Sequence, residues 1–362
     1  MQFIDLNYQY NRIKTDVNAR IQKVLDHGKY IMGPEIQELE ENLAAFVGVK
    51  HCILLGNGTD ALLVAMMSLG IKAGDEVITT PFSFFATTET IALLGAKPVY
   101  VDIDPKTYNI DPTKIEAAIT PKTKLILPVS LYGQCADFDA INAIAKKHNL
   151  PVLEDAAQSI GATYKGKQSG SLTDIAATSF FPSKPLGCYG DGGACFTNDD
   201  NFAIIIKQIR EHGSDRRYHH IRLGINGRLD SLQAAILLAK MAIFPEEIKL
   251  REEVGKKYTA LLKDKFITPY IEPFNTCVYA QYTVQLENRD ESQAKLQQLG
   301  IPTAVHYPIP LHKQPVFIDQ YRDLQLPIVE EIAQKVVSLP MHPYIKDEEI
   351  KYVAENLLAI QR

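Results

Sequence analysis

The chain has 362 residues, of which 46% are hydrophobic and 22% charged, and its formal net charge is −5. This length predicts a large domain and a smaller one, and the composition is that of a folded globular protein rather than a disordered one. The slight acidic excess, with no basic tail or stripe, argues against sequence-independent nucleic-acid binding.

The cysteines and the apolar runs indicate the cellular compartment and whether a metal is bound. The five cysteines are scattered without a CxxC pair, which predicts neither a disulfide framework nor a metal site. The amino terminus lacks the pattern of a signal peptide, and the most apolar internal stretch, 234–244, is broken by Lys240. We therefore expect a cytoplasmic protein with no membrane span.

The first two thirds of the chain alternate between two hydrophobic periodicities. Helical patterns over 12–27 and 34–47 are separated by a turn rich in glycine and ending in Pro34. Strand-like runs then alternate with helical ones, at 52–55, 77–80, 98–103, 124–130, 151–154, 176–181 and 194–197. This alternation predicts an α/β fold over 1–243, with a mostly parallel sheet covered by helices on both faces.

The alternation stops near residue 241, and a different pattern follows. A charged amphipathic run over 244–265 predicts a long connecting helix. Beyond it we expect a strand over 281–286, a helix over 291–299, a proline-rich segment over 302–315, and helices over 328–337 and 347–360. These elements predict a smaller α+β domain over 244–362.

A strand, a glycine turn and a helix start follow one another at 51–62. Backbone N–H groups and the helix dipole at such a start favour a phosphate, and Thr59 would add a hydroxyl. The same letters satisfy the dinucleotide fingerprint G-x-G-x-x-A, but the next strand lacks the acid at its far end that would hold a ribose. That far end carries Phe84, whose ring would stack on a flat heteroaromatic or simply belong to the core.

The central motif is one lysine, Lys184, which follows two serines, Ser179 and Ser183, and precedes four glycines within ten residues. A lysine in partly apolar surroundings loses its proton more easily and becomes the usual nucleophile toward aldehydes, although a lysine in a loop is more often solvated. Its candidate partner is Asp155, which ends an apolar strand 29 residues earlier. A carboxylate in that position would keep a pyridine nitrogen protonated, whereas an isolated acid there is more often a cap or a metal ligand.

Two further segments offer groups that suit anionic ligands. The loop before residue 231 contains Asn226, an amide donor, and Arg228, a planar fork suited to carboxylate or phosphate. His306 and Tyr307 lie in a stiff proline-rich segment that would aim both side chains at a ligand. A solvated loop and a structural turn are the competing interpretations.

Taken together, the motifs resemble those of the DegT/DnrJ/EryC1/StrS family of sugar aminotransferases. The likeness extends over nearly the whole chain, through Gly33-Pro34, 57–62, 154–158, 179–194, 226–228 and 306–307. It implies the type I aminotransferase fold, a homodimer with an active site shared between subunits, and pyridoxal 5′-phosphate as cofactor, converted to pyridoxamine 5′-phosphate for the second half-reaction.

The resemblance also implies a role for each motif residue. Lys184 would bond covalently to the cofactor's aldehyde and act as general base, Asp155 would hold the ring nitrogen, and Phe84 would stack on the ring. The phosphate would be bound by Gly58, Thr59, Ser179 and, from the partner subunit, Asn226, while Gln158 would lie on the hydroxyl side of the ring.

Within the family, the likeness is to enzymes that move the amino group of L-glutamate to C3 of a UDP-linked 3-keto-2-acetamido-2-deoxy-hexuronic acid, for surface polysaccharides such as the O-antigen. Arg228, His306 and Tyr307 would then recognise the sugar carboxylate. One alternative is amination at C4 of a UDP- or dTDP-4-keto-6-deoxy sugar. A remote one is a non-catalytic regulator that binds the same cofactor on the same fold.

Overall fold

The computed structural model describes residues 1–360. Its centre is a sheet in two parts. The first part contains β3 (Lys97–Tyr100), β2 (Glu76–Thr79) and β4 (Thr123–Leu127). The second contains β5 (Leu153–Asp155), β8 (Ile175–Ser179), β9 (Gly193–Thr197) and β1 (His51–Leu55). Parallel bridges Ile126–Val152 and Val129–Asp155 join β4 to β5, so the order is β3-β2-β4-β5-β8-β9-β1. Only β9 runs against the direction of the other strands, which confirms the mostly parallel sheet.

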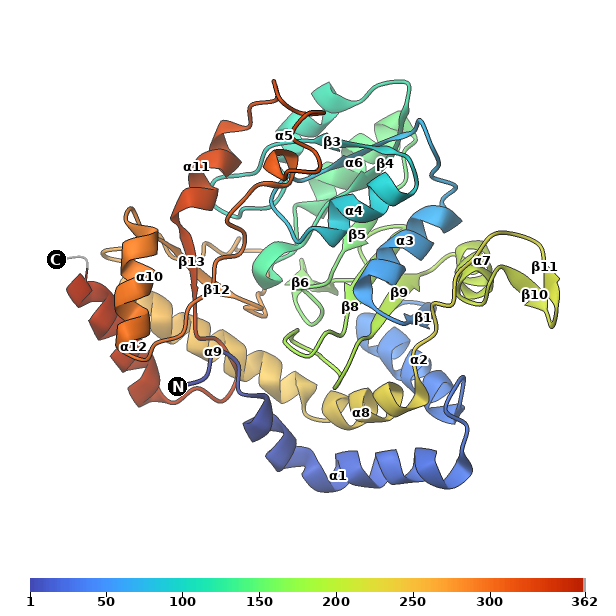
Figure 1. The fold of residues 1–362 in the computed structure, drawn as a ribbon, viewed down its shortest axis with the longest axis horizontal. Helices are drawn as coiled ribbons and strands as arrows, with labels where there is room; N and C mark the ends of the chain where they lie inside the picture. The colour runs from blue at the N-terminus through green and yellow to red at the C-terminus, as the bar shows by residue number, and fades with distance from the viewer. Residues whose placement is uncertain (361–362) are drawn as a thin grey trace.

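Helices cover both faces of this sheet, as the sequence pattern predicts (Figure 1). Alternate side chains of a strand point to opposite faces. In β1, Ile53 and Leu55 pack with α3 (Gly58–Ser68) and α7 (Asp200–Arg210). Cys52 and Leu54 pack on the other face, with α2 (Pro34–Val47) and α8 (Ser231–Met241). The remaining flanking helices are α4 (Ala86–Leu93) and α6 (Phe138–His148).

The C-terminal part begins with α9 (Phe244–Leu262), and most of its elements share an apolar cluster of their own. It contains β12 (Tyr282–Gln285), α10 (Arg289–Gln298), α11 (Pro327–Lys335), β13 (Val336–Leu339) and α12 (Asp347–Ile360). β12 and β13 pair antiparallel, with Tyr282 opposite Leu339. The helix predicted over 328–337 is therefore wrong at its end, because Val336 and Val337 already belong to β13.

The amino-terminal helix is longer than predicted. α1 (Leu6–His27) begins six residues before the expected start at 12, because Asp5 caps it by accepting a hydrogen bond from Tyr8 N at 2.8 Å. It packs along α8 at one side of the molecule (Figure 1).

Short elements complete the chain. They are α5 (Pro112–Ile115), the 3₁₀ turns Glu116–Ala118, Leu131–Gly133 and Leu311–Lys313, the pair β6 (Thr163–Tyr164) and β7 (Lys167–Gln168), and the hairpin β10 (Ser214–Arg216) and β11 (His219–His220). The β10–β11 hairpin projects from the edge of the molecule opposite the C-terminal part (Figure 1). Over residues 1–360, the helices lack the combination of length and apolarity that crossing a membrane requires.

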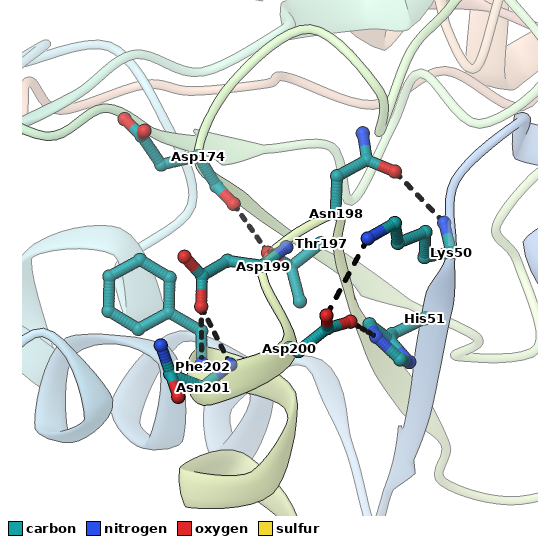
Figure 2. A network of polar contacts seen from close by, with 9 residues as sticks. All are labelled: Lys50, His51, Asp174, Thr197, Asn198, Asp199, Asp200, Asn201 and Phe202. Atoms are coloured by element: carbon teal, nitrogen blue, oxygen red, sulfur yellow. Dashed lines mark hydrogen bonds and ion pairs between the residues drawn. The ribbon is translucent and has the colours of Figure 1, made fainter.

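A polar network fixes the junction between β9 and α7 (Figure 2). Asp199 caps α7 by accepting hydrogen bonds from Asn201 N at 2.7 Å and Phe202 N at 2.9 Å. The neighbouring Asn198 accepts one from Lys50 N, at 2.9 Å, at the start of β1. These contacts lie at the end of β9 where it leaves the sheet.

Candidate active site

A cavity of about 690 Å³ opens where several elements meet at one edge of the sheet. Its walls come from the ends of β5 and β8, the starts of α3 and α4, and the segment around residue 306. The cavity brings together most of the predicted site residues: Gly58, Thr59, Phe84, Asp155, Gln158, Ser179, Lys184, His306 and Tyr307. This location is where open α/β sheets usually bind ligands.

The start of α3 forms a narrow cradle against β8. Asn57 caps the helix by accepting a hydrogen bond from Asp60 N at 2.7 Å. A Cβ on Gly58 would lie 2.6 Å from the Cβ of Ser179, so only glycine allows this approach. Ser179 Oγ accepts a hydrogen bond from Phe181 N at 3.2 Å, which leaves its own proton for a ligand. Hydroxyl and backbone donors at a helix start suit a phosphate.

Asp155 is a buried carboxylate at the carboxyl end of β5. Its Oδ2 accepts a hydrogen bond from Thr87 Oγ1 at 2.8 Å, and its Oδ1 accepts one from Ala157 N at 3.1 Å. Burial raises the pKa of Asp155, while these two hydrogen bonds and the charge of Lys184 act in the opposite direction. A cationic group placed against this buried carboxylate would favour its ionised form.

Lys184 lies in the loop after β8 and lines the cavity beside Asp155. The loop turns tightly, with Lys184 N donating to Phe181 O at 2.8 Å. Burial lowers the pKa of Lys184, and the charge of Asp155 opposes this shift. The alternative of a solvated loop lysine is therefore wrong, and the amine is closer to its nucleophilic, neutral form than a free lysine.

The aromatic side of the cavity is formed by Phe84 and Tyr307, whose ring centroids are 6.4 Å apart. Phe84 has 57% of its surface exposed, which is unusual for a core ring and leaves a face open to a ligand. Gln158 is buried behind them, where it accepts a hydrogen bond from Tyr132 N at 2.7 Å and donates one to Tyr307 Oη at 3.0 Å. The Gln158 amide thus ties the Tyr307 ring to the end of the sheet.

His306 is oriented by the pair β12–β13. Its Nδ1 lies 2.9 Å from Ser338 Oγ, which in turn lies 2.9 Å from Thr283 Oγ1. Burial, together with the nearby charge of Lys184, lowers the pKa of His306 to about 4. The ring is therefore neutral near pH 7.

Asn226 and Arg228 do not join the other predicted residues within this chain, as far as the described residues 1–360 show. Their loop lies behind the start of α3, where Gly227 O accepts a hydrogen bond from Gly56 N at 2.8 Å. Asn226 is exposed, and Arg228 Nε is buried with no hydrogen-bond partner among the described residues.

Several cavity residues have no prediction from the sequence. They are chiefly Ser83, Thr87, Asp191 and Gln281. Thr87 could have been found from the sequence. It lies three positions after Phe84 at the start of a helix, and this spacing places both side chains on the same face of that helix. Gln281 had no such signal, since the segment before β12 reaches the cavity only through the packing of the C-terminal part. No group of three or more His, Cys, Asp or Glu side chains suited to a metal ion occurs in residues 1–360.

Comparison with known proteins adds independent findings. The sequence profile described as the DegT/DnrJ/EryC1/StrS aminotransferase family matches residues 11–358. The chain is 62% identical to the UDP-2-acetamido-2-deoxy-3-oxo-D-glucuronate aminotransferase of Pseudomonas aeruginosa, over 99% of both chains. It is 48% identical to a pleiotropic regulatory protein of Geobacillus stearothermophilus, over 99% of this chain and 98% of the other. Among solved structures, NtdA of Bacillus subtilis with bound cofactor PMP superposes with a TM-score of 0.91, at 34% identity, over 99% of this chain and 83% of the other.

Proposed function

The chain belongs to the DegT/DnrJ/EryC1/StrS aminotransferase family, and from that premise we propose that it moves the amino group of L-glutamate to C3 of a UDP-linked 3-keto-2-acetamido-2-deoxy-hexuronic acid. Members of this family depend on pyridoxal 5′-phosphate. The observation that carries the proposal is the 62% identity over the full chain to an enzyme named for that sugar, in a protein whose cavity joins Lys184 to Asp155.

The residues of the cavity fit pyridoxal 5′-phosphate. The cradle of Gly58, Thr59 and Ser179 would take the phosphate, since a Cβ at position 58 would collide with Ser179. The exposed face of Phe84 would support the ring. The cofactor supplies an aldehyde that accepts amino groups and a ring that withdraws electrons from the carbon next to them.

Two side chains would perform the proton chemistry. Asp155 would keep a proton on the ring nitrogen, because a buried carboxylate is stabilised by a cationic neighbour. Lys184 would hold the cofactor through Nζ, and the same amine, once released, would carry the proton away from the α-carbon of L-glutamate. In the second half-reaction it would deliver a proton along the same path. Because the two substrates would use the same site one after the other, the kinetics should be ping-pong.

The charge of the cavity supports the proposal of a homodimer with shared sites. Among its lining residues within 1–360, Lys184 is the only lysine or arginine, against three aspartates, Asp60, Asp155 and Asp191. A UDP-linked uronate brings a diphosphate and a carboxylate, which require cations. We propose that the partner subunit supplies them through Arg228, with Asn226 of that same loop on the cofactor phosphate, while His306 and Tyr307 of this chain face the sugar.

A substrate comparison tests the proposed sugar. The 3-keto-hexuronic acid and a 4-keto-6-deoxy sugar, each linked to UDP, would be offered to the wild type and to Arg228→Ala. An arginine paired with a desolvated carboxylate is worth about 2–5 kcal/mol, so the variant should lose about 30-fold or more in kcat/KM for the uronate alone. Equal losses for both sugars, or preference of the wild type for the deoxy sugar, would exclude the carboxylate clamp.

A regulatory role is the second candidate, and it is suggested by the 48% identity to the pleiotropic regulatory protein of Geobacillus stearothermophilus. A regulator would bind the cofactor without cycling. Adding L-glutamate to the purified, cofactor-loaded protein and following the absorbance of the cofactor decides the matter. We expect conversion within seconds to minutes, followed by recovery when the keto-sugar is added.

We further propose a cytoplasmic role in the synthesis of surface-polysaccharide sugars such as those of the O-antigen. The five cysteines are all free and buried, which is compatible with a reducing compartment. Nucleotide-linked amino-sugar products of this kind are the activated donors that glycosyl transfer requires.

A further inference from the structure

Two buried hydroxyl groups, those of Thr87 and Ser83, form a row of hydrogen bonds that ends at the carboxylate of Asp155. Thr87 Oγ1 lies 2.8 Å from Asp155 Oδ2, and Ser83 Oγ lies 2.8 Å from Thr87 Oγ1. Thr87 is fully buried, and Ser83 and Asp155 are only 3% and 5% exposed. All three line the cavity.

The chemistry of the groups fixes the direction of the two hydrogen bonds. An ionised carboxylate accepts hydrogen bonds and donates none, so the single hydroxyl proton of Thr87 points at Asp155. Thr87 Oγ1 is then available only as an acceptor, and Ser83 must donate to it. The result is an ordered chain from Ser83 through Thr87 to Asp155.

The contact is not the one that a helical threonine usually makes. Such residues commonly bond back to the carbonyl four positions earlier. Thr90, on the same helix α4 and equally buried, does so with Ala86 O at 2.8 Å. Thr87 instead reaches across to a strand 68 residues away in the sequence. The pair Thr87 and Thr90 therefore offers a test residue and a matched control.

We propose that the hydrogen bonds from Ser83 to Thr87 and from Thr87 to Asp155 form a positioning relay. This relay keeps Asp155 ionised and aimed at the ring nitrogen of the cofactor. The inference rests on the proposed function for the presence of that ring. Burial works against the ionised carboxylate, and the hydroxyl of Thr87 opposes this effect. Without the hydroxyl the carboxylate becomes more basic, and the proton shared with the ring nitrogen moves toward Asp155. Proton removal by Lys184 would then be slower, because a ring without that proton would withdraw electrons less strongly.

The relay is tested on the holoenzyme loaded with cofactor labelled with ¹⁵N in its ring. The ¹⁵N chemical shift reports directly whether the ring nitrogen carries the proton. Thr87→Val should move the shift from the protonated toward the unprotonated position and slow the half-reaction with L-glutamate about 10- to 100-fold, as expected for a lost hydrogen bond to a charged group. Thr87→Ser should retain both properties, and Thr90→Val should leave them as in the wild type.

The outcomes separate the relay from a packing role and from the proposed function. If Thr87→Val lowers stability toward urea while the ¹⁵N shift and the half-reaction stay unchanged, Thr87 only packs and the relay is excluded. Should Thr87→Val fail to fold, Ser83→Ala replaces it, with a smaller displacement in the same direction expected and no displacement excluding the relay. Neither readout uses a sugar, so a failure of the substrate proposal would leave them intact.

Discussion

At the scale of single residues, burial decides the behaviour of several titratable groups, and His342 is the clearest outside the cavity. It is 4% exposed, and its Nδ1 has no partner among residues 1–360. Burial, followed by the nearby charge of Arg251, lowers its pKa to about 4. Asp5 and Glu349 act in the opposite direction. The folded state thus strongly prefers the neutral ring.

This preference predicts a loss of stability in acid. The unfolded chain binds a proton on His342 near pH 6.5 and the folded chain only near pH 4, so stability falls as the pH drops through that window. Between pH 7 and pH 5 the contribution is about 2 kcal/mol. Replacing His342 by Gln should reduce the pH dependence of urea unfolding by that amount. An unchanged difference between wild type and variant at the two pH values would show that His342 titrates normally.

The orientation of His306 gives a second residue-scale prediction. Ser338→Ala removes the hydroxyl that holds Nδ1, at a cost of about 1 kcal/mol, so we expect KM for the keto-sugar to rise about fivefold. The half-reaction with L-glutamate should keep its rate, and Ser338→Thr should behave as the wild type. If both half-reactions slow to the same extent, Ser338 supports the fold rather than the sugar site.

The sequence reveals those residues whose chemistry is local to a motif. Lys184 after two serines and Asp155 at a strand end are recognisable as a pair, because each is ambiguous alone and the two together match one chemistry. Ser338 and Gln158 gain their meaning from partners more than 30 and nearly 150 residues away, respectively, which no local pattern contains.

At the scale of elements, the junction between β9 and α7 depends on one cap. Asp199→Ala removes the acceptor of two backbone N–H groups, and we expect a loss of about 1 kcal/mol in the free energy of unfolding. Asp200→Ala is the neighbouring control, since Asp200 contacts only the exposed Lys50 and the partly exposed His51 in this network (Figure 2) and should cost less. Both variants should retain the L-glutamate half-reaction, because the junction lies outside the cavity. The cap would be unimportant if both variants unfolded at the same urea concentration.

Elements with a strong period of their own are predictable from the sequence, whereas those defined by a distant partner are not. The helix expected over 34–47 is found as α2, Pro34–Val47, with its glycine caps at both ends. β13 continues directly from α11, and its residues 336 and 337 extend the apolar pattern of the helix. They become a strand because β12, some fifty residues earlier, offers its edge. The division at residues 243 and 244 remains our proposal. Most elements after it share one apolar cluster, whereas α11 packs with residues of the first part such as Phe82 and Tyr100.

At the scale of the whole molecule, the order of the strands explains why the site lies at one edge of the sheet. β5 and β8 are parallel neighbours, with Asp155 opposite Ala177, so Asp155 and Ser179 lie near the same end of the two strands. The starts of α3 and α4 reach the same edge from β1 and β2, and bring Gly58 and Thr87 to it. Composition and periodicity predict such a sheet, but its order follows only from the pairing of strands far apart in the chain.

The proposed sharing of sites between two subunits yields the last prediction. Lys184→Ala removes the amine, and Arg228→Ala removes the cation that we assign to the opposite site, so each homodimer alone should be nearly inactive toward the uronate. A mixed dimer would contain one site with Lys184 from one chain and Arg228 from the other. Because random pairing makes half of the dimers mixed, refolding the two variants together should restore about one quarter of wild-type activity. If both residues served the same chain's site, every site in the mixture would lack one of them, and activity would not return.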